Sequence, residues 1–328
     1  MRARFRAVVL ATVVALLATA CSNPLPSVSP EAEAVPPPVL SAAQSQTVLA
    51  AVGSVLSTSD QALDPTGLSA RLTGPALTMR TAEYIRSTAT GGAKAPTALP
   101  ANEASAVIPQ TDVWPRTMLV ITEQPDDLSA RRVLILQQGS PREQYKLWGW
   151  ARMFPGEFPT TAALTTGSAV VAADDPDLVV PPSAVLSQYA DVLANGASSA
   201  SAATYAGDTF RTATEANRTQ QQALAAEGGA TFTETYAAVD GPVVSLATQD
   251  GGALVVGQLS TTSTITAAEG GTLTNSDPFS AALAGAAPTT SLARTYTDVL
   301  VFYVPPASAG GQVVALAAEQ ILTAAAVS

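Results

Sequence analysis

The residue types that perform most enzyme chemistry are absent or scarce in this chain of 328 residues. It contains no histidine, which excludes Ser-His-Asp and Cys-His catalysis and histidine-ligated zinc. Its only cysteine is Cys21, and its lysines are Lys94 and Lys146. A Ser-x-x-Lys nucleophile would need a serine three residues before a lysine, where the chain has Gly91 and Glu143. No phosphate-binding or dinucleotide-binding glycine motif occurs either.

Carboxylates are the groups that remain for catalysis. A glycosidase needs two of them across a cleft, and the candidates are Glu143, Glu157, Asp174, Asp175 and Asp177. They stand in charged or proline-rich segments, where a solvated side chain is the default. The acidic run also fails as a calcium loop, because the sixth and twelfth positions counted from Asp174 are valines rather than glycine and glutamate. A carboxylate-dependent hydrolase stays an alternative, and we expect a protein that is not an enzyme and that uses no cofactor or metal.

The densest group of bulky side chains lies between Tyr145 and Phe154. If this segment is a strand, alternation puts Trp148, Trp150, Arg152 and Phe154 on one face. Two indoles and a guanidinium suit a pocket for an apolar or anionic ligand, so these four are the candidate ligand-binding residues. Core packing is the competing interpretation, because tryptophan supplies bulk that an alanine-rich core lacks. We expect at least one of the two tryptophans to belong to the core.

The beginning of the chain has the layout of a secretory signal peptide. Three arginines lie in the first six residues, an apolar run follows, and small residues lead to Cys21. The apolar run of about 11 residues is shorter than the roughly 20 that a membrane span needs. The segment resembles a bacterial lipobox, except that Ala18 stands where that pattern prefers leucine, valine or isoleucine. The resemblance implies that residues 1–20 are removed and that Cys21 carries diacylglyceryl and an acyl chain such as palmitate, which anchor the protein in the cell membrane on its extracytoplasmic face.

Composition narrows the choice of partner. The net charge is −10, and removing the three arginines of the signal peptide makes it −13. An acidic surface repels phosphate backbones, so we expect no nucleic acid partner. With one cysteine, the fold depends on its own core rather than on disulfides. The expected partners are the membrane, through the lipid on Cys21, and an envelope protein or cell-wall component.

The surrounding pattern predicts the elements that position these residues. Residues 21–40 are rich in proline and form an extended tether. Apolar residues at helical spacing predict helices near 48–56 and 185–193, with shorter helical pieces near 68–72 and 78–86. Short β-branched runs predict strands near 117–122, 132–137, 145–154, 243–246, 254–259, 297–304 and 312–316.

The helix-then-strand pattern occurs twice, with the helical faces that start at Val48 and Val185 offset by 137 residues. It predicts an α+β fold of two tandem domains, residues 41–167 and 183–328, joined by a linker at 168–182. In each domain, N-terminal helices pack on a curved antiparallel sheet.

This element order resembles the NTF2-like, or cystatin-like, fold, and the whole chain resembles uncharacterised alanine-rich lipoproteins of actinobacteria. We expect a membrane-anchored, non-catalytic lipoprotein that binds or organises a cell-envelope component. The alternative that the NTF2-like resemblance adds is a small-molecule-binding protein that uses the sheet face at 145–154.

Overall fold

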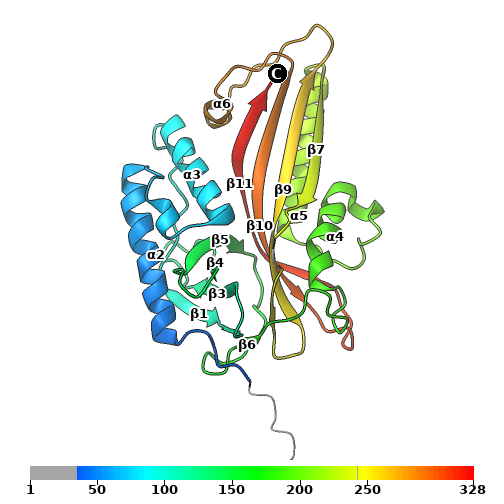
Figure 1. Cartoon of the computed structure of the whole chain (residues 1–328). Coiled ribbons are helices and arrows are strands. Elements are labelled where there is room, and N and C mark those ends of the chain that lie inside the picture. The colour runs from blue at the N-terminus through cyan, green and yellow to red at the C-terminus, as the bar shows by residue number, and fades with distance from the viewer. Residues whose placement is uncertain (1–34, 242) are drawn as a thin grey trace, which may run out of the picture. The chain divides into compact units, whose positions relative to one another are not determined.

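In the computed structural model, which describes residues 35–241 and 243–328, each half of the chain begins with two α-helices and continues mainly with antiparallel strands, and the second half adds a short third helix (Figure 1). The first half, residues 36–167, contains α2 (Ala42–Ala62), η1 (Leu68–Ala70), α3 (Gly74–Ala89), β1 (Glu103–Val107), β2 (Pro109–Gln110), β3 (Arg116–Thr122), β4 (Arg132–Gln138) and β5 (Lys146–Met153). The predicted signal peptide, Cys21 and most of the predicted tether lie outside the described residues.

Beyond the short β6 (Ser168–Ala169), the second half repeats this order. Residues 183–328 are its predicted range, and its first helix begins one residue earlier. It contains α4 (Pro182–Asn195), η2 (Gly196–Ser198), α5 (Thr209–Glu227), β7 (Ala230–Ala238), β8 (Val244–Ala247), β9 (Ala253–Ala267), α6 (Pro278–Ala284), β10 (Ser291–Val304) and β11 (Val314–Val327). The α+β class and the large antiparallel sheet are therefore confirmed, whereas the division into two tandem NTF2-like domains stays a prediction.

Local signals explain where the helices begin. At the start of α2, the Ser41 hydroxyl accepts a hydrogen bond from the Gln44 amide at 3.3 Å, and the Gln44 side chain accepts one from the Ser41 amide at 2.8 Å. This reciprocal pair is a capping box. The buried face of α2 contains Leu49, Val52 and Leu56, as the helical spacing predicted.

Nine strands form one sheet in the order β1-β3-β4-β5-β11-β10-β9-β7, with β8 paired to β9, and β2 and β6 form a separate parallel pair. The last strand of each half meets the last strand of the other, antiparallel. Only Arg152 opposite Ala318 and Met153 opposite Ala317 are paired there, so the strand pairing between the halves is a short seam. By contrast, β10 pairs with β9 and with β11 along most of its length.

The apolar core also extends across both halves. The side chains of α2, α3 and β1–β5 share one cluster with Val256, Val299 and Val301 of the second half. A second cluster lies between α4 and the sheet, where the ring of Tyr189 contacts Phe302 at 4.9 Å and Tyr205 at 5.6 Å between centroids. Residues 36–328 accordingly form one compact unit.

The segment 168–182, predicted as a linker, is hydrogen-bonded to both halves. The Ser168 amide donates to the Ile108 carbonyl at 2.8 Å. The Ser245 hydroxyl donates to the Val171 carbonyl at 2.7 Å. Within the described part of the chain, no helix combines the length and the apolar character that crossing a bilayer requires.

Candidate ligand-binding site

The four aromatic and basic residues predicted to share one face of β5 are separated in the structure. Trp150 is fully buried in the core, so the expectation that at least one tryptophan is core is confirmed. Trp148 is half-buried and lines a different cavity, beside Leu186. Of the four residues, only Arg152 and Phe154 line a common cavity.

A β-bulge interrupts strict alternation in this segment, and both tryptophans lie against α3, whereas Arg152 and Phe154 line a cavity beside α5. The register of β4 with β5 shifts so that Ile135 pairs with Gly149 and Leu136 with Leu147. Trp148 is therefore the extra residue, and strict alternation is interrupted at its position. Beyond the bulge, Trp150 lies below the guanidinium of Arg80 from α3, whereas a side chain at Gly149 would meet Val299.

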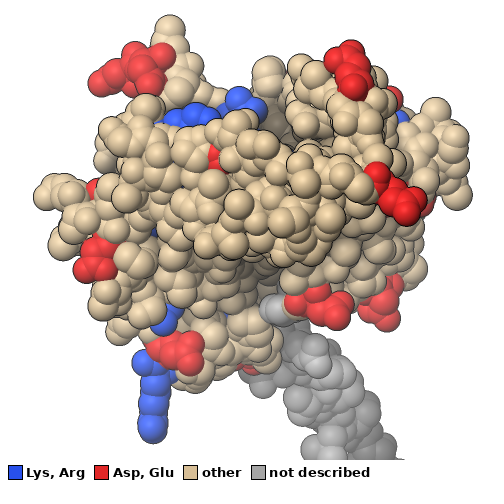
Figure 2. Space-filling model, turned by 90° about the horizontal axis from the view of Figure 1, so that it is seen from above, with Lys and Arg blue, Asp and Glu red and all other residues tan. Residues whose placement is uncertain are grey.

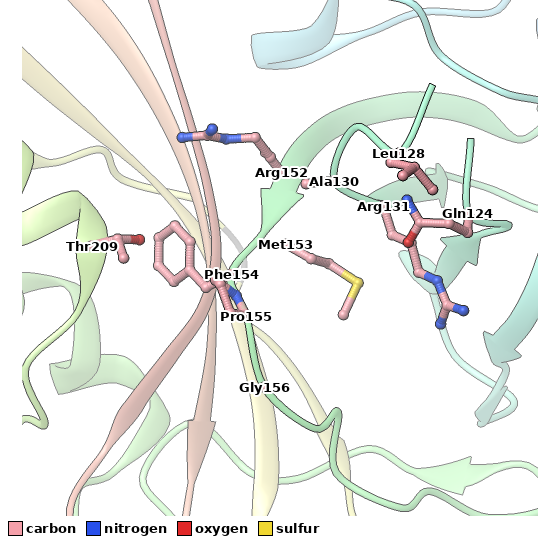
Figure 3. A pocket seen from close by; sticks show the side chains of 10 residues that line it. All are labelled: Gln124, Leu128, Ala130, Arg131, Arg152, Met153, Phe154, Pro155, Gly156 and Thr209. Carbon is pink, nitrogen blue, oxygen red and sulfur yellow. The ribbon is translucent and has the colours of Figure 1, made fainter. Parts of the chain in front are cut away.

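The cavity that holds Arg152 and Phe154 has a volume of about 580 Å³ and lies where the end of β5 passes the start of α5 (Figure 3). The loop between β3 and β4 forms its opposite wall. Figure 3 shows Met153 directed toward that loop and Phe154 directed toward Thr209. Its lining residues are Gln124, Leu128, Ala130, Arg131, Arg152, Met153, Phe154, Pro155, Gly156 and Thr209.

Two guanidinium groups of this cavity are free of protein partners. Within the described residues, neither Arg131 nor Arg152 forms a side-chain hydrogen bond or an ion pair. The neighbouring Arg132, the first residue of β4, does have a partner, because its Nη1 lies 2.5 Å from Glu319 Oε2. Arg131 and Arg152 are both exposed, so their donors are available to an anion that enters the cavity.

An apolar side chain stands at the mouth of the cavity. Leu128 is 82% exposed, and its backbone adopts the left-handed region with φ of 59°. A non-glycine residue rarely takes this conformation, so the loop must be fixed by other contacts. The Leu128 amide donates to the Pro125 carbonyl at 3.0 Å, and the Ser129 amide donates to Asp127 Oδ1 at 2.9 Å. These bonds hold the loop, and Leu128 with it, at the wall of the cavity that Arg131 also lines.

A second cavity, of about 330 Å³, adjoins the first. Arg152, Phe154 and Thr209 line both, and the second continues along α5 and the sheet. It contains two carboxylates, Glu234 and Glu319. Burial raises the pKa of both carboxyl groups above the ordinary glutamate value. The two adjoining cavities thus share Arg152, with Arg131 in the larger and the two carboxylates in the smaller.

The carboxylates singled out in the sequence lie elsewhere. Glu143, Glu157, Asp174 and Asp177 are exposed on loops and line none of these cavities. Asp175 Oδ1 accepts a hydrogen bond from the Asp177 amide at 2.9 Å, so the acidic run forms a turn. Among the described residues, no three acidic side chains are grouped so as to hold a metal ion.

The charge on the surface is scattered. Figure 2 shows a face that is mostly uncharged, with acidic and basic side chains in small separate groups. Arg131 and Arg152 both line the larger cavity, where each guanidinium can bind a small anionic group.

Sequence reasoning missed Leu128, Arg131, Met153 and Thr209. The turn signal at Pro125-Asp126-Asp127 marked the loop but not its nearness to residue 209. No local pattern could indicate that contact, because it depends on the pairing of β5 with β11.

The fold and the cavity define a class of protein: an α+β protein with one large antiparallel sheet and an open, arginine-lined cavity where its halves meet. Residues 36–326 match the family described as "Domain of unknown function (DUF8094)", and the chain belongs to that family. No curated protein matches the chain. No solved structure matches it either.

Proposed function

We propose that the protein is a membrane-anchored, extracytoplasmic lipoprotein without catalytic activity, and that it binds an anionic, partly apolar component of the cell envelope. One observation carries the binding proposal: a single open cavity is lined both by apolar side chains and by Arg131 and Arg152, which have no protein partner among the described residues. The anchor rests on the signal-peptide layout and Cys21.

The chemistry of the lining favours a ligand with two parts. Guanidinium groups bind carboxylate, sulfonate or phosphate oxygens through charge-assisted hydrogen bonds. Leu128, Met153 and Phe154 offer apolar surface for an acyl or aromatic portion. At about 580 Å³, the cavity lies in the range of small-molecule sites, which span roughly 300–1,000 Å³.

The test uses 1-anilinonaphthalene-8-sulfonate, a fluorescent probe with one sulfonate and an aromatic body. The wild-type protein is expected to bind it, and Arg152→Gln and Arg131→Gln are each expected to weaken binding about tenfold, since one charge-assisted hydrogen bond is worth about 1.5–3 kcal/mol. Phe154→Ala is expected to weaken binding through lost apolar contact.

Arg142→Gln is the matched control, because Arg142 is an exposed arginine in the turn between β4 and β5 and lines neither cavity. It is expected to bind the probe like the wild type. If all three arginine variants bind equally well, the probe does not use this cavity and the proposal is wrong.

A carboxylate-dependent hydrolase is the second candidate, and one observation favours it: Glu234 and Glu319 line the same cavity. Glu319 is already ion-paired with Arg132, which leaves it poorly suited to donate a proton. Turnover of 4-nitrophenyl glycosides that disappears in Glu234→Gln would establish the hydrolase. We expect no turnover.

The tandem, NTF2-like description also belongs to this proposal. The repeated order of two helices followed by antiparallel strands supports it. In this description, the binding cavity lies at the seam between the two repeats.

A further inference from the structure

The two cavities at the seam differ in chemistry although they adjoin. Arg131 lines only the larger cavity, Glu234 and Glu319 line only the smaller, and Arg152 lines both. Phe154 also lines both, so an apolar side chain lies between Arg131 and the two carboxylates. A ligand that fills both therefore meets opposite charges at its two ends.

Glu234 is the carboxylate without a cationic partner. It lies on β7, it is half-buried, and its hydrogen bond comes from the hydroxyl of Tyr236 on the same strand. Arg218 of α5 is close enough to lower the pKa of this carboxyl, but burial outweighs it and no ion pair within 4.0 Å forms. Arg218 instead donates to the Leu193 carbonyl at 2.6 Å. Glu234 thus keeps acceptor capacity toward the cavity.

A second carboxylate lies behind the same wall. Asp298 of β10 is fully buried and stands opposite Gln320, which lines the smaller cavity. Its Oδ2 accepts a hydrogen bond from the Thr261 hydroxyl at 2.5 Å, whereas its Oδ1 has no hydrogen-bond partner in the described part of the chain. Burial raises the pKa of the Asp298 carboxyl to about 7, so below that pH it is mostly protonated and does not compete with Glu234 for a cation.

Resting on the proposed function, we infer that the ligand is bipolar: its anionic group binds at Arg131 and Arg152, and a primary amine at its other end binds at Glu234, with an apolar spacer along Phe154. The ligand class is therefore an ω-amino acid or a compound with the same arrangement of charges. The amine would donate a hydrogen bond to Glu234 in a partly buried site, where a charge-assisted hydrogen bond is stronger than at an exposed site.

Calorimetric titration with pairs of ligands that differ only in the amine tests this inference. The probes are unbranched ω-amino carboxylates of 6, 8, 10 and 12 carbons, each compared with the fatty acid of the same length. We expect one length at which the amine strengthens binding to the wild type about tenfold. That preference is expected to vanish in Glu234→Gln and to remain in Glu215→Gln, which changes an exposed glutamate of α5 outside the cavity.

The outcomes separate the inference from the proposed function. Binding of fatty acids without any gain from the amine, or a gain that survives in Glu234→Gln, overturns the bipolar ligand and leaves the anion site intact. If neither ligand series binds, both fail.

A gain of function guards against a Glu234→Gln variant that fails to fold. Asn217 lines the smaller cavity from the exposed face of α5, so Asn217→Asp adds a carboxylate at little structural risk. It is expected to increase the preference for the amine about threefold or more, as a partly exposed ion pair worth roughly 0.7 kcal/mol would. An unchanged preference counts against the inference.

Discussion

Arg80 of α3 lies over the indole of Trp150 of β5, with its guanidinium carbon 5.4 Å from the ring centroid, and both side chains are fully buried. Arg80 Nη1 also donates to Glu83 Oε2 at 2.8 Å and to the Thr97 carbonyl at 2.8 Å. The cation is therefore paired as well as stacked, as a buried charge requires. This contact fixes α3 on the sheet and places Trp150 among the residues that stabilise the fold.

Replacing Trp150 with alanine is accordingly expected to lower the free energy of unfolding by about 3–5 kcal/mol, since it deletes a large buried ring. Trp148→Ala, at a half-buried position, is expected to cost about 1–2 kcal/mol. Urea denaturation followed by circular dichroism measures both. Equal losses in the two variants would contradict the assignment of Trp150 to the core and of Trp148 to a cavity wall.

Gly74 is expected to tolerate no side chain. Its φ is +54°, and an added Cβ would lie 2.9 Å from two atoms of the Trp148 ring. Gly74→Ala is expected to destabilise the protein by about 2–3 kcal/mol, through backbone strain and this clash. Gly91→Ala is the matched control, because Gly91 has φ of +59° and nothing within 4 Å of its Cβ position.

The control Gly91→Ala is expected to lower the free energy of unfolding by about 1–2 kcal/mol, from backbone strain alone. Adding Trp148→Ala to Gly74→Ala removes the clash. The double variant is therefore expected to lose less free energy of unfolding than the sum of the two single variants. Additive losses would show that the ring moves aside freely.

Asp298 makes stability depend on pH. Burial raises the pKa of this carboxyl to about 7. Because its pKa when unfolded is about 3.9, the folded state binds the proton more tightly, and the free energy of unfolding falls as pH rises from about 4 to about 7. The loss is expected to be on the order of 2–4 kcal/mol.

Urea midpoints at pH 4.5, 5.5, 6.5 and 7.5 measure this slope. Asp298→Asn keeps an oxygen for the Thr261 hydroxyl and removes the titration, so its profile is expected to be flatter and higher at pH 7.5. A wild-type slope that persists unchanged in the variant would assign it to other groups.

Limited proteolysis tests the predicted division at 168–182. Residues 172–174, 176 and 177 are exposed, so cleavage is expected there, giving two fragments of about 16 kDa each on a denaturing gel. The fragments are expected to elute together in size-exclusion chromatography, because β5 pairs with β11 and the two halves share a core. Separate elution of folded fragments would support independent domains.

Cys21→Ser tests the anchor. The wild-type protein is expected in the membrane fraction, and the variant is expected to be released or to stay unprocessed, because the lipid attaches to the thiol. Mass spectrometry of the mature N-terminus distinguishes the two forms. A processed variant that still partitions with membranes as the wild type does would show that the lipobox interpretation is wrong.

Much of the fold could be predicted where apolar periodicity is strong. The helical face of Val48 to Leu56 corresponds to α2, and the β-branched run 117–122 corresponds to β3. The same signal fails in α5, where only Thr214 and Ala225 are buried and the helix is mostly polar. Asp208, whose side chain caps α5 by accepting from the Arg211 amide at 2.8 Å, was the available clue.

Composition misleads at the C-terminal strand. Residues 314–327 are rich in alanine, which favours helix, yet they form the long strand β11 because β10 pairs with it along its length. Only residues 312–316 were predicted as strand. The cavity depends on the pairing of this strand with β5, so its assembly could not be predicted from local patterns.

The short seam between β5 and β11 has a consequence for how the halves stay together. Antiparallel pairing of equivalent last strands is the kind of contact by which two identical subunits meet around a two-fold axis. Here the two partners belong to one chain, and residues 168–182 tether them, so each meets the other at an effective concentration of roughly millimolar or more. Dilution therefore cannot dissociate them, and the melting temperature is expected to be independent of protein concentration, even though only two residue pairs join the strands.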